Sequence, residues 1–322
     1  MDLANNIRRR RLEMGLSQQE LADSVGYKSR SAIAKIEMGE NNIPVSKLLE
    51  IAEALDTKAE YLLAGNNSTS FGIKRNDSNK AKDGKMQTKT AAVILAGGKS
   101  SRNMQNVPNQ FINIQNKPVI GYVLDVYQAH PLIDEIYIVC LEHWKRVVEA
   151  YCLQNGIDKL RGLIVPGNTG IKSALQGYKA LLSEGYSARD TVIFQESTRP
   201  LITQEMITQT LENCSKKGSA VIGEHANDNL QFVVNGDKAK YLERSKVISM
   251  QSPDAYKLET LSDIFNKAAK SKHTMNESCI GMLMVNLGFN PNFVEGPHNN
   301  IKLVRQEDIL TFSALLKQKE YL

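Results

Sequence analysis

The sequence predicts two domains of different fold classes: a small all-α bundle over residues 1–65, and an α/β domain with a mostly parallel sheet over residues 90–322. In the first range, apolar residues recur at helical spacing and no strand-like alternation interrupts them. In the second range, apolar runs rich in β-branched residues alternate with helical segments, which is typical of a parallel sheet covered by helices. Residues 66–89 are polar and basic, so we expect a flexible linker there.

The composition is that of a globular protein, with 42% hydrophobic and 23% charged residues. No run of 18 or more apolar residues occurs and the first residues lack the apolar segment of a secretory signal, so we expect a cytoplasmic protein without a membrane span. The four cysteines have no paired spacing, which argues against a zinc site or a redox pair. The net charge of +5 is unevenly spread, so only local basic clusters can support nucleic-acid binding.

Helix caps and a turn glycine predict a helix-turn-helix in the first domain. Ser17 followed by Glu20 is a capping box, so a helix should begin at Gln18. Gly26 permits a sharp reversal, and a second helix should begin near Ser29. The segment GLSQQELADSVGYKSRSAIAKIEMGE closely resembles the Cro/repressor-type family, and the resemblance continues to residue 63.

This resemblance implies that the second helix enters the major groove of double-stranded DNA while the first lies across the backbone. Arg30 is the best candidate for reading a base, because a guanidinium can pair bidentately with guanine. For Lys28 and Lys35 the alternative is a solvated helix face. The basic run 8–11 is expected on a helix flank, either near phosphate or as solubilising surface. The candidate DNA contacts are Gln18, Lys28, Ser29, Arg30, Ser31 and Lys35.

Buried strands alternate with helices in the second domain. The expected strands are 91–97, 135–141, 162–167, 190–195 and 219–224, and the expected helices are 121–130, 143–155, 172–185 and 203–214. Ligands of such folds bind at the carboxyl ends of the strands. The segment LAGGKSSR directly follows the first strand, where backbone N–H groups and a cation can cradle phosphates, although it matches neither common glycine fingerprint.

Five segments, the first of which extends this loop, follow the order and spacing of a known enzyme family. They are LAGGKSSRNMQNVPNQF, QNKPVIGYVL, IFQESTRPLIT, MQSPDAYKL and GFNPNFVEGPHNNIKLVRQEDI. They resemble the cytidylyltransferases that make CDP-alcohols, namely those acting on 2-C-methyl-D-erythritol 4-phosphate and on ribitol 5-phosphate. The resemblance covers about residues 90–322 and implies a Rossmann-like nucleotidyltransferase fold.

The resemblance also implies chemistry and site residues. An alcohol phosphate attacks the α-phosphorus of CTP and pyrophosphate leaves, with Mg²⁺ as the metal ion, so the site needs cations around the triphosphate and a carboxylate for the metal. The matching positions are Arg102, Arg199 and Lys302 as catalytic cations, Ala96, Gly97, Gly98 and Ser173 for the nucleotide, Arg244 for the substrate phosphate, and Glu196 for the metal. For the four cations the alternative is a surface ion pair.

Several positions depart from the family pattern. Asn109 stands where the family has a lysine, and Gly170 stands where it has an arginine. Glu196 replaces an aspartate, Asn276 lies in an altered threonine-aspartate element, and Asp254 ends an element that is threonine-proline-glutamine in the family. The loss of two cations is expected to weaken triphosphate binding, so these changes bear on whether catalysis survives.

Three functions fit these patterns. One is a DNA-binding transcriptional regulator whose second domain binds CTP or a polyol phosphate, with altered or lost catalysis. Another is a working cytidylyltransferase with an accessory helix-turn-helix domain. In the third, the large domain serves only as a dimerisation scaffold. A homodimer on a two-fold operator is expected, because the family enzymes are typically dimers and one small helix-turn-helix seldom binds tightly without a second half-site.

Overall fold

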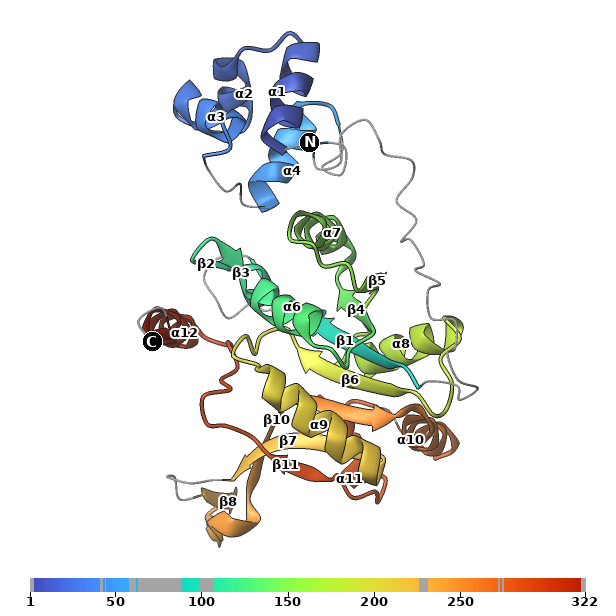
Figure 1. Ribbon diagram of the computed structural model, residues 1–322. Helices are drawn as coiled ribbons and strands as arrows, with labels where there is room; N and C mark the ends of the chain where they lie inside the picture. Colours follow the sequence, from blue (N-terminus) through green and yellow to red (C-terminus); the bar gives the residue numbers. More distant parts are fainter. Residues whose placement is uncertain are drawn as a thin grey trace. The chain divides into compact units, whose positions relative to one another are not determined.

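The computed structural model describes residues 3–40, 43, 45–57, 62, 88–98, 107–225, 231–271, 273 and 275–319. The chain divides into two compact units, one around the N-terminal helices and one around a seven-stranded sheet (Figure 1). Most of the predicted linker lies outside the described residues. Within the described ranges, every helix is too short or too polar to span a bilayer.

The first unit is all-helical, as predicted. Its helices are α1 (Leu3–Glu13), α2 (Gln18–Ser24), α3 (Arg30–Glu37) and α4 (Val45–Ala54). The capping box of Ser17 and Glu20 is present, and α2 begins at Gln18. Gly26 takes a positive φ of 71° at the turn between α2 and α3, which an L side chain disfavours. Apolar side chains from all four helices are fully buried: Ile7, Leu21, Ile33, Leu48 and Ile51.

A buried ion pair joins α1 to α3. Arg11 Nε lies 2.6 Å from Glu37 Oε1, and Arg11 Nη2 donates to Glu37 Oε2 at 3.0 Å. The Gln18 side-chain amide donates to the same carboxylate at 2.9 Å. Burial raises the pKa of Glu37, but the hydrogen bonds from Arg11 and Gln18 outweigh burial and leave this pKa below its ordinary value. The prediction that residues 8–11 lie on the surface, near phosphate or as solubilising side chains, is therefore wrong for Arg11. Its guanidinium is buried in an ion pair inside the helical bundle.

The second unit is built on a sheet of strand order β11-β7-β10-β6-β1-β4-β5. The strands are β1 (Thr90–Ala96), β4 (Glu135–Cys140), β5 (Leu160–Ile164), β6 (Thr191–Glu196), β7 (Ser219–His225), β10 (Ile248–Lys257) and β11 (Phe293–Glu295). The pairs β1–β4, β1–β6, β4–β5 and β7–β11 are parallel, which confirms a mostly parallel sheet. The interior strand β10 is antiparallel to both neighbours and was not predicted, because it contains a proline and several polar residues.

Helices and short elements complete residues 107–319, of which 115–117 and 142–158 group with the first unit. The helices are α6 (Val119–Ala129), α7 (Lys145–Gln154), α8 (Gly170–Ser183), α9 (Gln204–Lys217), α10 (Leu258–Lys270), α11 (Ile280–Asn286) and α12 (Gln306–Lys319). The short elements are η2 (Asn109–Phe111), β2 (Asn113–Ile114), β3 (Lys117–Pro118), η3 (Glu142–Trp144), β8 (Gln231–Asn235), β9 (Lys238–Leu242) and η4 (Arg244–Lys246). Helices α8, α10 and α11 share one core cluster with the sheet, while α9 packs on β7 and β10.

The segment after β11 returns to the carboxyl end of β6. Leu303 is 1% exposed and shares a second core cluster with Ile112, Val119 and Phe312 of α12. The Leu303 N–H donates to the Thr198 carbonyl at 2.8 Å, just after β6. This packing carries the C-terminal loop, residues 296–305, to the edge of the sheet where ligands of such folds bind.

Candidate functional site

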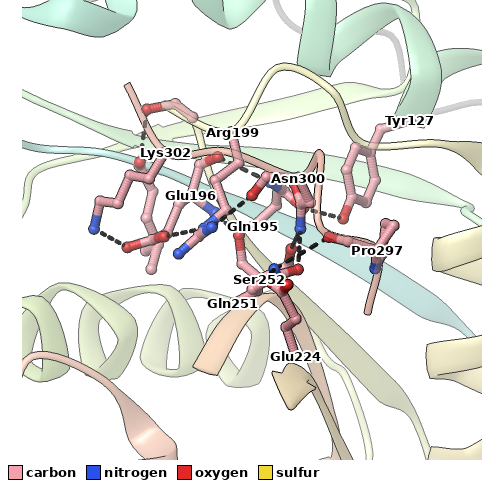
Figure 2. Close-up of polar contacts among 12 residues, drawn as sticks. Tyr127, Gln195, Glu196, Arg199, Glu224, Gln251, Ser252, Pro297, Asn300 and Lys302 are labelled. Carbon is pink, nitrogen blue, oxygen red and sulfur yellow. Dashed lines mark hydrogen bonds and ion pairs between the residues drawn. The ribbon is translucent and has the colours of Figure 1, made fainter. Parts of the chain in front are cut away.

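Glu196 is the last residue of β6, and its carboxylate lies between two cations (Figure 2). Oε2 is 2.7 Å from Arg199 Nε, in the turn that follows the strand. Oε1 contacts the Lys302 ammonium, which comes from the C-terminal loop. The fold therefore brings together Glu196, Arg199 and Lys302, three residues that the sequence predicted for one site.

The electrostatics of this cluster favour an anionic ligand. Burial raises the pKa of the Glu196 carboxyl, but the charges of Lys302 and Arg199 outweigh burial and leave the pKa below its ordinary value. Glu196 is therefore a carboxylate at neutral pH, and the three side chains carry a net charge of one positive unit. An excess of positive charge at the edge of a sheet attracts phosphate groups.

Hydrogen bonds of Asn300 and Ser252 hold Arg199 and the Glu196 backbone in place (Figure 2). The Asn300 carbonyl accepts from Arg199 Nη1 at 2.7 Å, and Asn300 Nδ2 donates to the Ser252 carbonyl at 2.8 Å. The Glu196 N–H in turn donates to Ser252 Oγ at 3.1 Å. Sequence reasoning missed Asn300 and Ser252 as site residues, although both lie within segments that carried the resemblance.

Tyr127 and Gln195 hold the end of β6 from the other side. The Tyr127 hydroxyl donates to Gln195 Oε1 at 3.1 Å, and Gln195 Nε2 donates to the Glu196 carbonyl at 2.9 Å. Both side chains are fully buried. The backbone of Glu196 is thus fixed by side chains, which holds its carboxylate at the strand end.

The start of the predicted nucleotide loop, Gly97 and Gly98 after β1, is held by a side chain and by close packing. Gln110 Nε2 donates to the Ala96 carbonyl at 2.8 Å and to the Gly98 carbonyl at 2.9 Å. A Cβ added at Gly97 would lie 2.6 Å from the Cβ of Pro166, so only glycine fits there. Arg102, the predicted cation of this loop, lies outside the described residues.

Ser173 lies on the first turn of α8 and is 8% exposed. Its hydroxyl donates to the Thr169 carbonyl at 2.9 Å. A Cβ at Gly97 would approach Ser173 Oγ to 3.8 Å, so Ser173 lies beside Gly97.

The departures from the family pattern occupy specific structural positions. Asn109 is 2% exposed, and its Nδ2 donates to two backbone carbonyls of the C-terminal loop. At Gly170, an added Cβ would overlap the Ser278 carbonyl oxygen. Asn276 is exposed. Burial, aided by the charge of Glu196, raises the pKa of Asp254 to about 7 even though Asp254 accepts a hydrogen bond from Tyr256.

The structure also places the other predicted site residues. Arg244 lies exposed in η4, after the β8–β9 hairpin. In the helical unit, the predicted DNA contacts Lys28, Ser29, Arg30, Ser31 and Lys35 are all exposed, at the start of α3 or along it. Gln18 differs, because its amide is already bonded to Glu37.

Two family models match this chain, one in each predicted domain. Residues 90–318 match the family model for 2-C-methyl-D-erythritol 4-phosphate cytidylyltransferase, and residues 7–62 match the helix-turn-helix model. Ribitol-5-phosphate cytidylyltransferase of Lacticaseibacillus paracasei is 30% identical over 232 residues, which are 71% of this chain and 98% of that protein. The 2-C-methyl-D-erythritol 4-phosphate cytidylyltransferase of Clostridium tetani is 27% identical over 72% of this chain and 92% of its own.

A solved structure has the same fold. The 4-diphosphocytidyl-2C-methyl-D-erythritol synthase of Anaerococcus prevotii superposes with a TM-score of 0.61 and 19% identity, covering 71% of this chain and 96% of that one. At this level of identity the likeness shows the fold alone, and it confirms the predicted nucleotidyltransferase architecture.

Restoring a side chain at position 170 should destabilise the second domain. We expect Gly170→Ala to lower the free energy of unfolding by about 1–3 kcal/mol, because the new Cβ would press on the Ser278 backbone. Gly170→Arg, which restores the family's residue, should cost at least as much. Denaturant unfolding measures this, and Gly98→Ala is the control, because a Cβ at Gly98 meets nothing within 4 Å. Equal stability of the 170 and 98 variants would contradict the expectation.

Proposed function

Since the chain belongs to the 2-C-methyl-D-erythritol 4-phosphate cytidylyltransferase family, we propose that its second domain transfers the cytidylyl group of CTP to a polyol phosphate, and that its helix-turn-helix domain binds DNA. The observation that carries the enzymatic part is the cluster at the end of β6. Glu196, Arg199 and Lys302 come together there from positions far apart in the sequence. Two cations around one carboxylate suit a reaction in which negative phosphates must approach each other.

The proposed reaction is a displacement at phosphorus. An oxygen of the polyol phosphate attacks the α-phosphorus of CTP, the bond from that phosphorus to the bridging oxygen breaks, and pyrophosphate leaves with the bonding electrons. Arg199, whose side chain is 12% exposed, is held by Glu196 and the Asn300 carbonyl and provides a fixed charge. Lys302, at 43% exposure, can turn from Glu196 toward the α-phosphate.

Glu196 suits a magnesium ion that arrives with the nucleotide. Among the described residues, no group of three or more His, Cys, Asp or Glu side chains could hold a metal. Mg²⁺ is commonly bound by one or two carboxylates together with substrate phosphates and water, so the single carboxylate of Glu196 fits this mode. When bound, magnesium would supply charge neutralisation along the triphosphate. Arg244 is proposed to bind the phosphate of the second substrate, as its place in the family pattern implies.

A second candidate function is a nucleotide sensor that regulates DNA binding without rapid turnover. Position 109 provides a neutral amide committed to the backbone, and position 170 has no room for a side chain. Both positions therefore lack a cation that the family pattern contains. Weaker stabilisation of the triphosphate would slow transfer while leaving a ligand pocket that could set operator affinity.

DNA binding and a homodimer complete the proposal. Arg30 and its neighbours at the start of α3 are exposed, as groove contacts require. In the β8–β9 hairpin, Phe232, Val234 and Tyr241 are 53%, 69% and 47% exposed, so an apolar surface is available for a second copy. A cytoplasmic location is part of the proposal, because both DNA and CTP must be within reach.

Pyrophosphate release tests the enzymatic proposal. With CTP, Mg²⁺ and a panel of polyol phosphates, we expect release that Glu196→Gln reduces by about a hundredfold or more, because the amide keeps the shape but removes the charge. Glu212→Gln, at an exposed carboxylate of α9, is the matched control and should be unaffected. If there is no release, but CTP or a polyol phosphate changes operator affinity, the sensor function is supported instead.

Base reading by Arg30 is tested on a selected operator. We expect Arg30→Ala to cost about 1–3 kcal/mol of binding free energy and to relax specificity at one base pair. Lys35→Ala should weaken binding to all sequences alike, because a phosphate contact carries no sequence information. Fluorescence anisotropy across single-base operator variants measures both effects. An unchanged base preference for Arg30→Ala would remove Arg30 from base reading.

The homodimer is tested by sedimentation velocity. We expect a dimer at micromolar concentration, and we expect Val234→Asp to shift the protein toward monomer because a charge would be placed on the exposed apolar hairpin. Leu182→Asp is the control, since Leu182 is also exposed, at 45%, but lies on α8. A monomeric native protein would contradict the proposal.

A further inference from the structure

We propose that Asn109 is a positioning residue that sets the place of Lys302, and that Asn109 and Gln110 together tie the C-terminal loop to the loop after β1. Asn109 stands where the family pattern has a lysine, and we call the pair Asn109 and Gln110 the clamp. The inference rests on the proposed function for its catalytic meaning, but its structural content can be measured without any substrate.

The clamp is a single turn, η2, whose two polar side chains reach opposite loops. Asn109 Nδ2 donates to the Leu303 carbonyl at 2.9 Å and to the Val304 carbonyl at 3.1 Å. The next residue, Gln110, donates to the Ala96 and Gly98 carbonyls. Both side chains are 2% exposed, so little water competes for these bonds.

The bonds from Asn109 hold the carbonyls of Leu303 and Val304, the two residues that follow Lys302. Leu303 is anchored on both sides, because its N–H donates to the Thr198 carbonyl while its carbonyl accepts from Asn109. Its side chain is also buried in the second core cluster. With residue 303 fixed, the backbone of Lys302 can occupy only a narrow range of positions. From one of these the ammonium reaches Glu196.

The chemistry of position 109 explains why an amide serves there. Two backbone carbonyls require two donors, and an asparagine NH₂ supplies two without charge. An ammonium in the same buried place would lose its hydration, and a carboxylate would face two carbonyl oxygens. The two uncharged donors of Asn109 thus suit the two carbonyls that they bind. Asn109 affects the site only by fixing the position of Lys302.

The reactivity of Lys302 tests this role directly. Competitive acetylation followed by mass spectrometry measures the rate at Lys302 relative to Lys145, which has its own ion pair with Glu142. If Asn109 positions Lys302 on Glu196, the relative rate should rise by about two- to fivefold in Asn109→Ala, because an ion-paired amine is less available. Asn109→Asp should show the same rise despite its equal size, which separates the donor role from simple packing.

The acetylation rate at Lys302 is also measured in a control variant and in a milder variant of Asn109. Asn213→Ala is the matched control, because Asn213 also donates to a backbone carbonyl but lies on α9. Asn109→Ser, which keeps one donor, should give an intermediate rate and serves if Asn109→Ala fails to fold. In an active enzyme, kcat should fall in Asn109→Ala with little change in KM for the polyol phosphate. Folded Asn109 variants with native reactivity at Lys302 would overturn the proposal, whether or not the protein turns over CTP.

Discussion

The second domain depends on one electrostatic arrangement, the Glu196 carboxylate between Arg199 and Lys302. A carboxylate partly removed from water is costly unless cations compensate it, and here two cations do so. The same arrangement leaves an excess positive charge at the carboxyl end of the sheet. Much of the surrounding polar network, from Tyr127 to Asn300, can be understood as the support that keeps this carboxylate at the strand end.

The first domain depends on a comparable pair, Arg11 with Glu37, but uses it for a different purpose. This pair is almost fully buried and joins α1 to α3, so it holds the helix that carries Arg30 against the rest of the bundle. Breaking such a pair would leave a charge in the interior without compensation. The two clusters differ in exposure: the Arg11 and Glu37 side chains are 8% and 3% exposed, whereas Glu196 is 32% and Lys302 43% exposed.

The departures from the family pattern have a common structural character. The amide of Asn109 is bonded to backbone carbonyls, and Gly170 is covered by the backbone of residue 278. At both positions the chain uses the space for internal contacts. At Gly170 the family's arginine would meet the Ser278 backbone, because even a Cβ would overlap the Ser278 carbonyl oxygen. Among the described residues, the cations that contact Glu196 at the end of β6 are Arg199 and Lys302.

The sequence by itself determined the two fold classes and the start of α2 at Gln18, because periodicity and capping depend on neighbours along the chain. It placed Glu196, Arg199 and Lys302 in one candidate site only through the family resemblance. The sequence did not predict the strand β10, the burial of Arg11 or the bond from Gln18 to Glu37. It also did not predict the bonds from Asn109 to the C-terminal loop. Only the tertiary structure decided these, because each depends on hydrogen bonds, ion pairs or strand pairing between residues far apart in sequence.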